Sequence, residues 1–150
     1  MEVINVATNK KAHFQYHISD TFEAGMQLTG TEIKSVRAQQ VNLNESYCTF
    51  TEGELFVKGM HIAEYKFGTH YNHEAKRTRK LLLTKRELKK LLTKVKEKGF
   101  TIIPVRMYIT ERGFAKLEIG LAKGKKLFDK REDLKKKDAK REMEREGKGR

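Results

Sequence analysis

Apolar and polar residues alternate with a period of two along most of the chain from residue 13 to residue 120. This period is typical of β-strands that bury one face. It predicts two strands over 14–18 and 22–28, with a turn at Ser19–Asp20 between them. Further strands are predicted over 47–50, 55–57, 79–83, 103–109 and 115–119, with turns at 51–54 and 111–113.

Two segments break the alternation and follow the period of a helix. The segment 84–98 places leucine and valine residues on one face, opens with the capping box Thr84-x-x-Glu87 and is followed by Gly99. A shorter helix is predicted over 31–38, with Ile33 and Val36 on one side and Lys34 and Arg37 on the other.

Many short antiparallel strands with one or two inserted helices favour a mainly β fold, a small closed antiparallel barrel of the oligonucleotide-binding (OB) type. Pro104 cannot donate a ladder hydrogen bond, so its strand is predicted to be an edge strand or to carry a bulge there. We expect one barrel over residues 1–126 and a basic tail over 127–150.

The charge of the chain narrows the class of partner. There are 33 Lys and Arg against 20 Asp and Glu, a net charge of +13, which makes nucleic acid the first candidate and an anionic membrane the second. Residues 121–150 alone carry 13 basic and seven acidic residues, a net +6. With few apolar side chains, this tail is expected to be disordered when free.

Targeting signals and disulfides are not indicated. No apolar run is long enough for a signal peptide or a membrane span. Cys48 is the single cysteine and sits in the apolar context SYCTF, where it is expected to pack in the core. A protein of the reducing cytoplasm, with no membrane contact, is therefore expected.

Catalytic and metal sites are only weakly indicated. The loop from Gly120 to Lys125 leaves three residues between its glycines and is followed by Lys126, so it does not fit a phosphate loop. It suits contact with a phosphodiester backbone instead. The pair His70-x-x-His73 is a weak metal signal with only Glu74 nearby, and a structural or RNA-contacting role is expected. We expect no metal, no cofactor and no enzymatic activity.

A loop over 65–80 mixes aromatic and basic side chains, a composition suited to base stacking and phosphate contact. The alternative is a solvated loop with its aromatic rings tucked underneath. Its aromatic residues are Tyr65, Phe67 and Tyr71, and its basic residues are Lys66, Lys76, Arg77, Arg79 and Lys80.

The order of four segments adds a resemblance. NKKAHFQYHI (9–18), FEAGMQLTGTEIKSVR (22–37), RTRKLLLTKREL (77–88) and IGLAKGKKLFDKRE (119–132) together resemble the small protein B family, the SsrA-binding proteins of bacteria. The resemblance implies an OB-type barrel that binds transfer-messenger RNA (SsrA) and delivers it to stalled ribosomes in trans-translation. It implies a tail that becomes helical on the ribosome and probes the decoding centre and the empty messenger channel.

The resemblance also implies functional residues and partners. The partners are transfer-messenger RNA and the ribosome, and the protein is expected to be a monomer. Gln39–Gln40 stands where a glycine is usual, and Phe128 stands where some members carry His. The implied RNA-binding residues are Glu23, Gly25, Leu83, Lys116, Lys123, Gly124, Lys125 and Lys126, and the implied decoding-centre contacts are Phe128, Asp129, Lys130 and Arg131.

Two other readings stay open on the residues alone. One is a general ribosomal or translation-initiation protein of the OB type, which a preference for transfer-messenger RNA over other structured RNAs would exclude. The other is a metal-dependent nuclease that uses the loop of His70 and His73. RNA left intact in the presence of the protein and divalent metal would exclude the nuclease.

Overall fold

The computed structural model describes residues 3–68, 72–97 and 99–125, and more of these residues lie in strands than in helices. The elements in chain order are β1 (Ile4–Thr8), α1 (Ala12–Gln15), β2 (Tyr16–Met26), α2 (Gly30–Arg37), β3 (Val41–Asn42), β4 (Tyr47–Thr51), β5 (Glu54–Lys58), β6 (His61–Ile62), β7 (Arg79–Leu82), α3 (Lys85–Val95), β8 (Phe100–Ile109) and β9 (Ala115–Gly124).

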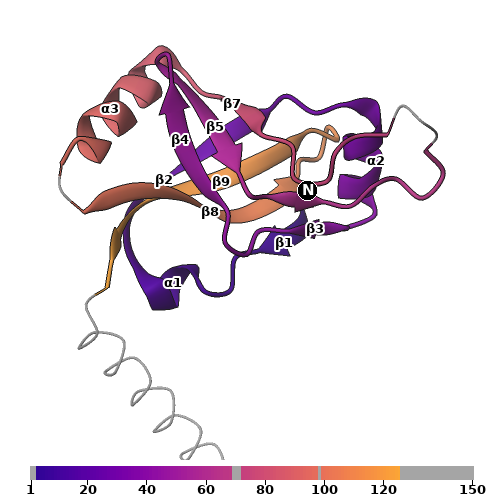
Figure 1. The fold of residues 1–150 in the computed structure, drawn as a ribbon, viewed down its shortest axis with the longest axis horizontal. Coiled ribbons are helices and arrows are strands. Elements are labelled where there is room, and N and C mark those ends of the chain that lie inside the picture. The colour runs from indigo at the N-terminus through magenta and orange to yellow at the C-terminus, as the bar shows by residue number, and fades with distance from the viewer. Residues whose placement is uncertain (1–2, 69–71, 98, 126–150) are drawn as a thin grey trace, which may run out of the picture.

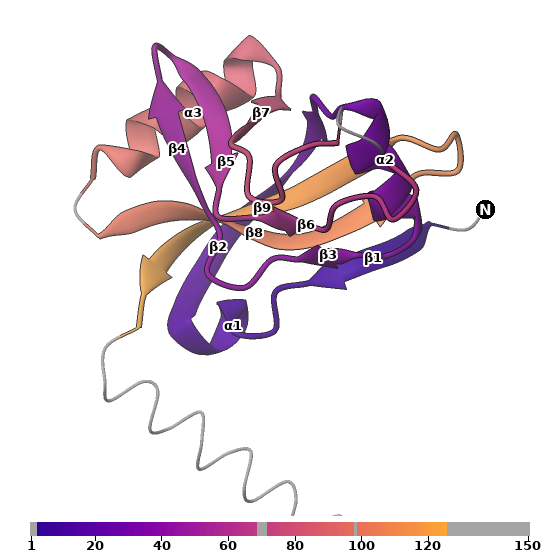
Figure 2. The same cartoon turned by 45° about the vertical axis from the view of Figure 1, so that its right-hand side comes forward.

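Seven of the strands form one antiparallel sheet in the order β1-β8-β4-β5-β7-β2-β9. Because β8 also pairs with β9, hydrogen bonds run in a closed ring through six strands, and β1 attaches outside the ring to β8. The strands β3 and β6 form a separate pair. Figures 1 and 2 show α2 and α3 at opposite ends of this arrangement. The prediction of a mainly β, antiparallel fold with inserted helices is confirmed.

The predicted turn at Ser19–Asp20 is wrong. β2 runs unbroken through these residues and follows β9 from the pair Tyr16–Gly124 to the pair Gly25–Lys116. The ladder takes up the irregularity as a bulge between Ile18 and Asp20. A long continuous partner strand therefore outweighs two polar residues that favour a turn when they are considered alone.

The first residues of the predicted strand over 14–18 are also helical. Phe14 lies in the short helix α1, so the strand begins only at Tyr16. Within the described residues there are thus three helices, one more than the sequence predicted.

The other strand predictions are confirmed. β4 and β5 form the expected hairpin, and its turn residues Glu52 and Gly53 both have positive φ, at 51° and 78°. β8 pairs with β9 as predicted and shifts register between Pro104 and Arg106. Since β8 lies inside the sheet, the bulge, and not the edge position, explains how Pro104 is tolerated.

The two predicted helices form with capping boxes at their starts. α3 has the predicted box, in which the Thr84 side chain accepts from the Glu87 backbone N–H, and it is followed by Gly99 at φ 89°. α2 begins slightly earlier than predicted, with Thr29 as its N-cap and Glu32 completing a second box. α3 contributes the fully buried Leu91 to the core.

The main core fills the inside of the strand ring. It joins inward residues of β2, β4, β5, β7, β8 and β9, including Leu55, Val57, Met107 and Leu117. Cys48 is buried in this core as predicted, and burial raises the pKa of its thiol well above the usual range. Among the described residues, no helix is both long enough and apolar enough to cross a membrane.

Candidate nucleic-acid interface

A groove of about 410 Å³ forms where β7, β2 and β9 lie side by side. Gly25 on β2 pairs with Leu82 of β7 on one side and with Lys116 of β9 on the other. Because Gly25 has no side chain, the floor of the groove stays open; a Cβ there would lie 3.3 Å from the Leu82 Cβ. We call this site the Gly25 groove; its lining residues are Gly25, Met26, Ile33, Arg37, Leu82, Arg112, Gly113, Phe114, Ala115 and Lys116.

Three cationic side chains from separate elements line the Gly25 groove. Arg37 ends α2, Arg112 lies in the β8–β9 turn and Lys116 lies on β9. Within the described part of the chain, none of the three forms an ion pair. Such cations suit an external anion, and Arg and Lys side chains are the main protein contacts to phosphate oxygens.

Two large apolar side chains stand exposed at the same groove. Leu82 is 46% exposed and Phe114 is 63% exposed. Apolar and aromatic surface beside cations is the combination that binds RNA bases and riboses together with their phosphates. The groove can therefore contact both parts of a nucleotide.

A carboxylate lies beside the groove, in the neighbouring row of the sheet. Glu23 is exposed and pairs across the ladder with Glu118, whose own carboxylate accepts a 2.5 Å hydrogen bond from Arg106. Burial and the nearby Glu23 carboxylate raise the pKa of the Tyr108 hydroxyl to about 12. The Glu23 carboxylate is exposed next to the Gly25 groove, where it is suited to accept hydrogen bonds from base or ribose donors.

The structure brings three of the predicted RNA-binding residues together, namely Glu23, Gly25 and Lys116. Leu83, predicted with them, is half-buried and packs against the core, while its neighbour Leu82 points into the groove. Because residues 81–83 are all leucine, the sequence pattern does not distinguish the side chain that faces the groove from those that face the core. Reasoning from sequence missed Leu82, Arg112 and Phe114 as groove residues, and it did not connect Arg37 with Lys116.

Two further predicted residues, Lys123 and Gly124, lie at the far end of β9, and Lys125 follows them. Lys123 and Gly124 are at least seven residues from Lys116, roughly 23 Å at about 3.3 Å per residue. The Lys125 backbone N–H donates to the Gln15 carbonyl, and the Lys123 Nζ sits 5.6 Å from the centre of the Phe100 ring. Lys126, Phe128, Asp129, Lys130 and Arg131 lie outside the described residues.

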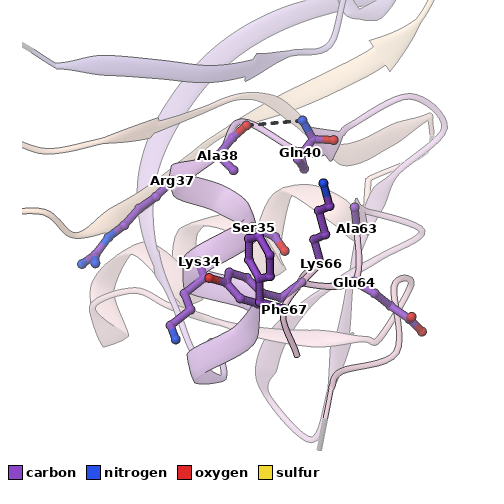
Figure 3. Close-up of a pocket in the computed structure, with 10 residues that line it drawn as sticks. Lys34, Ser35, Arg37, Ala38, Gln40, Ala63, Glu64, Lys66 and Phe67 are labelled. Atoms are coloured by element: carbon purple, nitrogen blue, oxygen red, sulfur yellow. Dashed lines mark hydrogen bonds between the residues drawn. The ribbon is translucent and has the colours of Figure 1, made fainter. Parts of the chain in front are cut away.

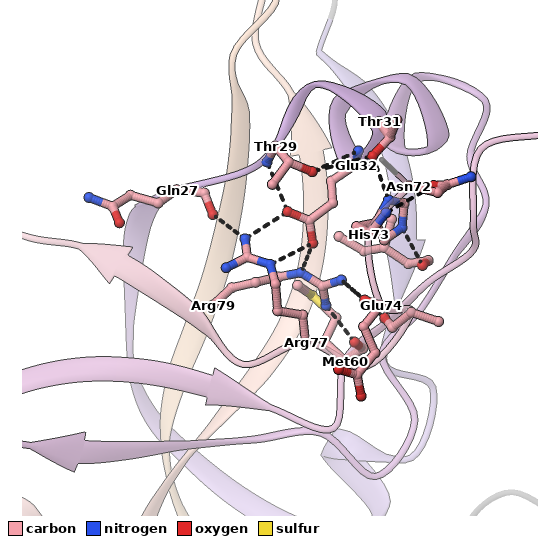
Figure 4. Close-up of polar contacts among 12 residues, drawn as sticks. Gln27, Thr29, Thr31, Glu32, Met60, Asn72, His73, Glu74, Arg77 and Arg79 are labelled. Atoms are coloured by element: carbon pink, nitrogen blue, oxygen red, sulfur yellow. Dashed lines mark hydrogen bonds and ion pairs between the residues drawn. The ribbon is translucent and has the colours of Figure 1, made fainter. Parts of the chain in front are cut away.

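Two arginines of the predicted basic loop pair with the buried carboxylate of Glu32 instead of forming an RNA surface (Figure 4). Arg79 is fully buried, donates to Glu32, and donates to the Met60 carbonyl at 2.7 Å and the Ala75 carbonyl at 3.0 Å. Arg77 donates to the same Glu32 carboxylate at 2.7 Å. The prediction that Arg79 contacts phosphate is therefore wrong. We call Glu32, Arg77 and Arg79 the Glu32 ion cluster.

The electrostatics of this cluster keep Glu32 ionised. Burial alone would raise the pKa of Glu32, but hydrogen bonds from Arg77, the Thr29 backbone N–H and Arg79 outweigh burial and lower the pKa to about 2. The cluster thereby ties the start of α2 to β7, and so it holds the helix that supplies Arg37 to the groove.

His73 has a structural role in the same region. Its Nε2 donates to the Ile62 carbonyl at 2.9 Å, which leaves Nδ1 to accept from the Thr31 hydroxyl at 2.9 Å. With both ring nitrogens engaged and the side chain buried, His73 is not placed to hold a metal. The described residues contain no group of three or more potential metal ligands, and His70 lies outside them.

Comparisons with known proteins agree with the resemblance seen in the sequence. The family model of the SmpB protein matches residues 6–149. An SsrA-binding protein of Phocaeicola vulgatus is 58% identical over 137 residues, which is 91% of each chain. One of Anoxybacillus flavithermus is 55% identical over 140 residues, 93% of this chain and 90% of the relative.

A solved structure described as "tmRNA-SmpB: a journey to the center of the bacterial ribosome" superimposes with a TM-score of 0.68 at 46% identity. The match covers 81% of this chain and 85% of the other. Together with the family model, which spans nearly the whole chain, these likenesses show that the chain belongs to the SmpB family.

Proposed function

We propose that this protein binds transfer-messenger RNA (SsrA) and delivers it to stalled ribosomes in trans-translation, with the Gly25 groove as the RNA contact. The proposal rests mainly on one observation: Arg37, Arg112 and Lys116 line the same groove around Gly25. None of the three forms an ion pair among the described residues. The SsrA-binding relatives, at 58% and 55% identity, support the choice of RNA.

The groove suggests how the RNA is held. Arg37, Arg112 and Lys116 contact phosphates, the exposed faces of Phe114 and Leu82 take apolar base or ribose surface, and Glu23 accepts from donors at the edge. Arginine and lysine contacts to phosphate set affinity and position, while Glu23 is suited to contacts that depend on the nucleotide. These roles require no catalytic group, which fits membership in a family of non-enzymatic RNA-binding proteins.

The ring of six strands supports a further proposal about architecture. We infer that it is a closed barrel of the OB type and that residues 1–126 form the RNA-binding domain. We also propose that the protein acts as a monomer, and that it is cytoplasmic because transfer-messenger RNA and ribosomes are cytoplasmic partners.

The basic segment 127–150 is proposed to act on the ribosome. Its excess of Lys and Arg suits a channel lined with ribosomal RNA. Phe128, Asp129, Lys130 and Arg131 are the proposed contacts at the decoding centre. On this division of labour, the strand ring holds the transfer-messenger RNA and the segment beyond it tests whether messenger is present.

The test measures binding of labelled transfer-messenger RNA across a salt series. Lys116→Ala should weaken binding and reduce the slope of log affinity against log salt by about one unit, because one phosphate contact is lost. Lys58→Ala on β5, outside the groove, is the matched control and should leave the slope unchanged. Removal of residues from Asp129 onward should preserve this binding but stop transfer of the nascent peptide onto the RNA.

Two results would contradict the proposal. Binding by the full chain that does not discriminate transfer-messenger RNA from other structured RNAs would favour a general ribosomal protein instead. Equal salt slopes for the Lys116→Ala and Lys58→Ala variants would remove the groove from the interface.

A further inference from the structure

A second hollow, of about 780 Å³, lies against α2 (Figure 3). It forms between the C-terminal half of α2 and the segment 63–67 that follows β6. Arg37 lines both hollows, so the two adjoin at the end of α2. We call it the Phe67 hollow; its lining residues are Lys34, Ser35, Arg37, Ala38, Gln40, Ala63, Glu64, Tyr65, Lys66 and Phe67.

An aromatic pair forms one side of the Phe67 hollow. The rings of Tyr65 and Phe67 meet edge to face, with centroids 5.7 Å apart and planes at 63°. Phe67 is 76% exposed, the most exposed large apolar side chain among the described residues, whereas Tyr65 is half-buried. One face of a phenyl ring is thus offered to solvent above a supporting ring.

Cations flank the aromatic pair. The Lys34 Nζ lies 5.0 Å from the centre of the Tyr65 ring, and the Lys66 Nζ lies 5.8 Å from the centre of the Phe67 ring. In the view of Figure 3 the Phe67 ring stands between these two lysine side chains. Glu64 is the one acidic residue in the lining, against Lys34, Arg37 and Lys66. The balance of charge favours an anionic occupant.

The segment that carries the aromatic pair is braced from behind. Asn72 donates from Nδ2 to the Tyr65 carbonyl at 2.8 Å, and its Oδ1 accepts from the Tyr65 and His73 backbone N–H groups at 3.1 Å each. A Cβ at Gly68 would lie only 2.4 Å from the Asn72 Nδ2, so a side chain at this position would displace Asn72 from these hydrogen bonds. The backbone of Tyr65 is therefore held in place before binding, which lowers the entropy cost of association.

We propose that the Phe67 hollow binds an unpaired base of the transfer-messenger RNA, stacked on the Phe67 ring, with the adjoining phosphates held by Lys34 and Lys66. An aromatic face beside cations is the usual protein surface for an unpaired nucleotide. Continuity with the Gly25 groove through Arg37 places the same RNA molecule within reach. The proposal rests on the proposed function and extends it to a second contact.

The experiment measures the affinity of the full chain for labelled transfer-messenger RNA. Phe67→Leu keeps an apolar side chain but removes the stacking face and should weaken binding about fivefold or more, whereas Phe67→Tyr should bind within about twofold of the wild type. Tyr47→Leu, which alters another exposed aromatic residue on β4, is the matched control and should bind as the wild type does.

Salt dependence and thermal unfolding separate stacking from other effects. Phe67→Leu should leave the salt slope and the melting temperature unchanged, because the ring is uncharged and largely exposed. Lys66→Gln should instead lower the slope by about one unit. Ultraviolet cross-linking of the complex should join the peptide that contains Phe67 to a nucleotide outside the paired stems.

The outcomes separate this inference from the proposed function. If the wild type fails to select transfer-messenger RNA, the proposed function falls first. If the wild type binds and Phe67→Leu binds equally well, only the stacking site is overturned. A Phe67→Leu variant that binds the RNA normally but is recruited poorly to ribosomes would assign the hollow to ribosomal RNA and likewise overturn the proposal.

Discussion

The Gly25 groove and the Glu32 ion cluster both include residues of α2 but use arginine in opposite ways. In the groove, Arg37 is exposed and no described carboxylate lies within ion-pair distance of it. In the cluster, Arg79 is fully buried and its donors are taken by Glu32 and three backbone carbonyls. The same residue type therefore supplies binding surface at one site and internal structure at the other.

The difference shows that clustered charge in a sequence does not measure an RNA-binding surface. The run Arg77 to Lys80 reads as one basic patch, yet its strand alternates, and Arg79 points inward with Leu81. The Lys80 Nζ pairs with Glu54 at 2.7 Å. The cations of the groove come instead from three separate elements, α2, the β8–β9 turn and β9.

The largest expected effect is a loss of stability when the buried arginine, Arg79, is replaced. Arg79→Met removes the partner of a buried carboxylate and should lower the free energy of unfolding by about 3–5 kcal/mol. The change leaves Arg77 as the only arginine partner of Glu32 and leaves the Met60 carbonyl without the hydrogen bond that Arg79 donates. Urea unfolding followed by circular dichroism measures the loss.

Arg77→Met is the matched control within the same cluster. The Arg77 side chain is 37% exposed, so solvent screens its ion pair and the cost should be about 1 kcal/mol or less. Equal losses for Arg77→Met and Arg79→Met would show that burial does not separate the two arginines and would remove the contrast drawn here.

The second-largest effect is expected at low pH, where the Glu32 ion cluster should lose its contribution to folding stability. The pKa of Glu32 is lowered from 4.5 to about 2 in the folded protein, so its contribution to stability is complete above pH 4.5 and is lost as the pH falls toward 2. The difference corresponds to about 3 kcal/mol. Glu32→Gln should be less stable at neutral pH and should show a flatter loss of stability across this window. Unfolding curves at a series of pH values measure both slopes.

A control for this titration is Glu54→Gln, because Glu54 is 48% exposed in its pair with Lys80. This variant should keep the steep acid dependence of the wild type. A Glu32→Gln variant as steep as the wild type below pH 4.5 would mean that other groups govern acid stability.

Much of the fold was predictable because local signals and the final structure agree. The β4–β5 hairpin, the bulge near Pro104 and the capping box at Thr84 each follow from a few neighbouring residues. The turn expected at Ser19–Asp20 fails for the opposite reason, since only the distant partner strand β9 decides it. A strand pairing of this kind is invisible to local patterns.

Part of the Gly25 groove was predictable, namely the residues that lie in recognisable sequence motifs. The family resemblance brought forward Glu23, Gly25 and Lys116, and the structure gathers these three. Phe114 and Arg112 were missed because their importance depends on the β8–β9 turn folding over toward Gly25. The inward direction of Arg79 could have been predicted from its alternation with Leu81, but its basic neighbours favoured the opposite reading.

The smallest expected effect, on Arg37, sharpens the comparison most directly. Arg37→Gln keeps the polar length of the side chain and removes the charge, so it should lower affinity for transfer-messenger RNA by about three- to tenfold and the salt slope by about one unit. Its free energy of unfolding should change by at most about 0.5 kcal/mol, since the side chain is exposed. Binding titrations and urea unfolding of the same preparation measure both.

Arg79→Met should show the reverse pattern, in which stability falls far more than affinity for the RNA. A destabilised Arg37→Gln variant with an unchanged salt slope would place Arg37 with the structural arginines and leave the groove with only two binding cations.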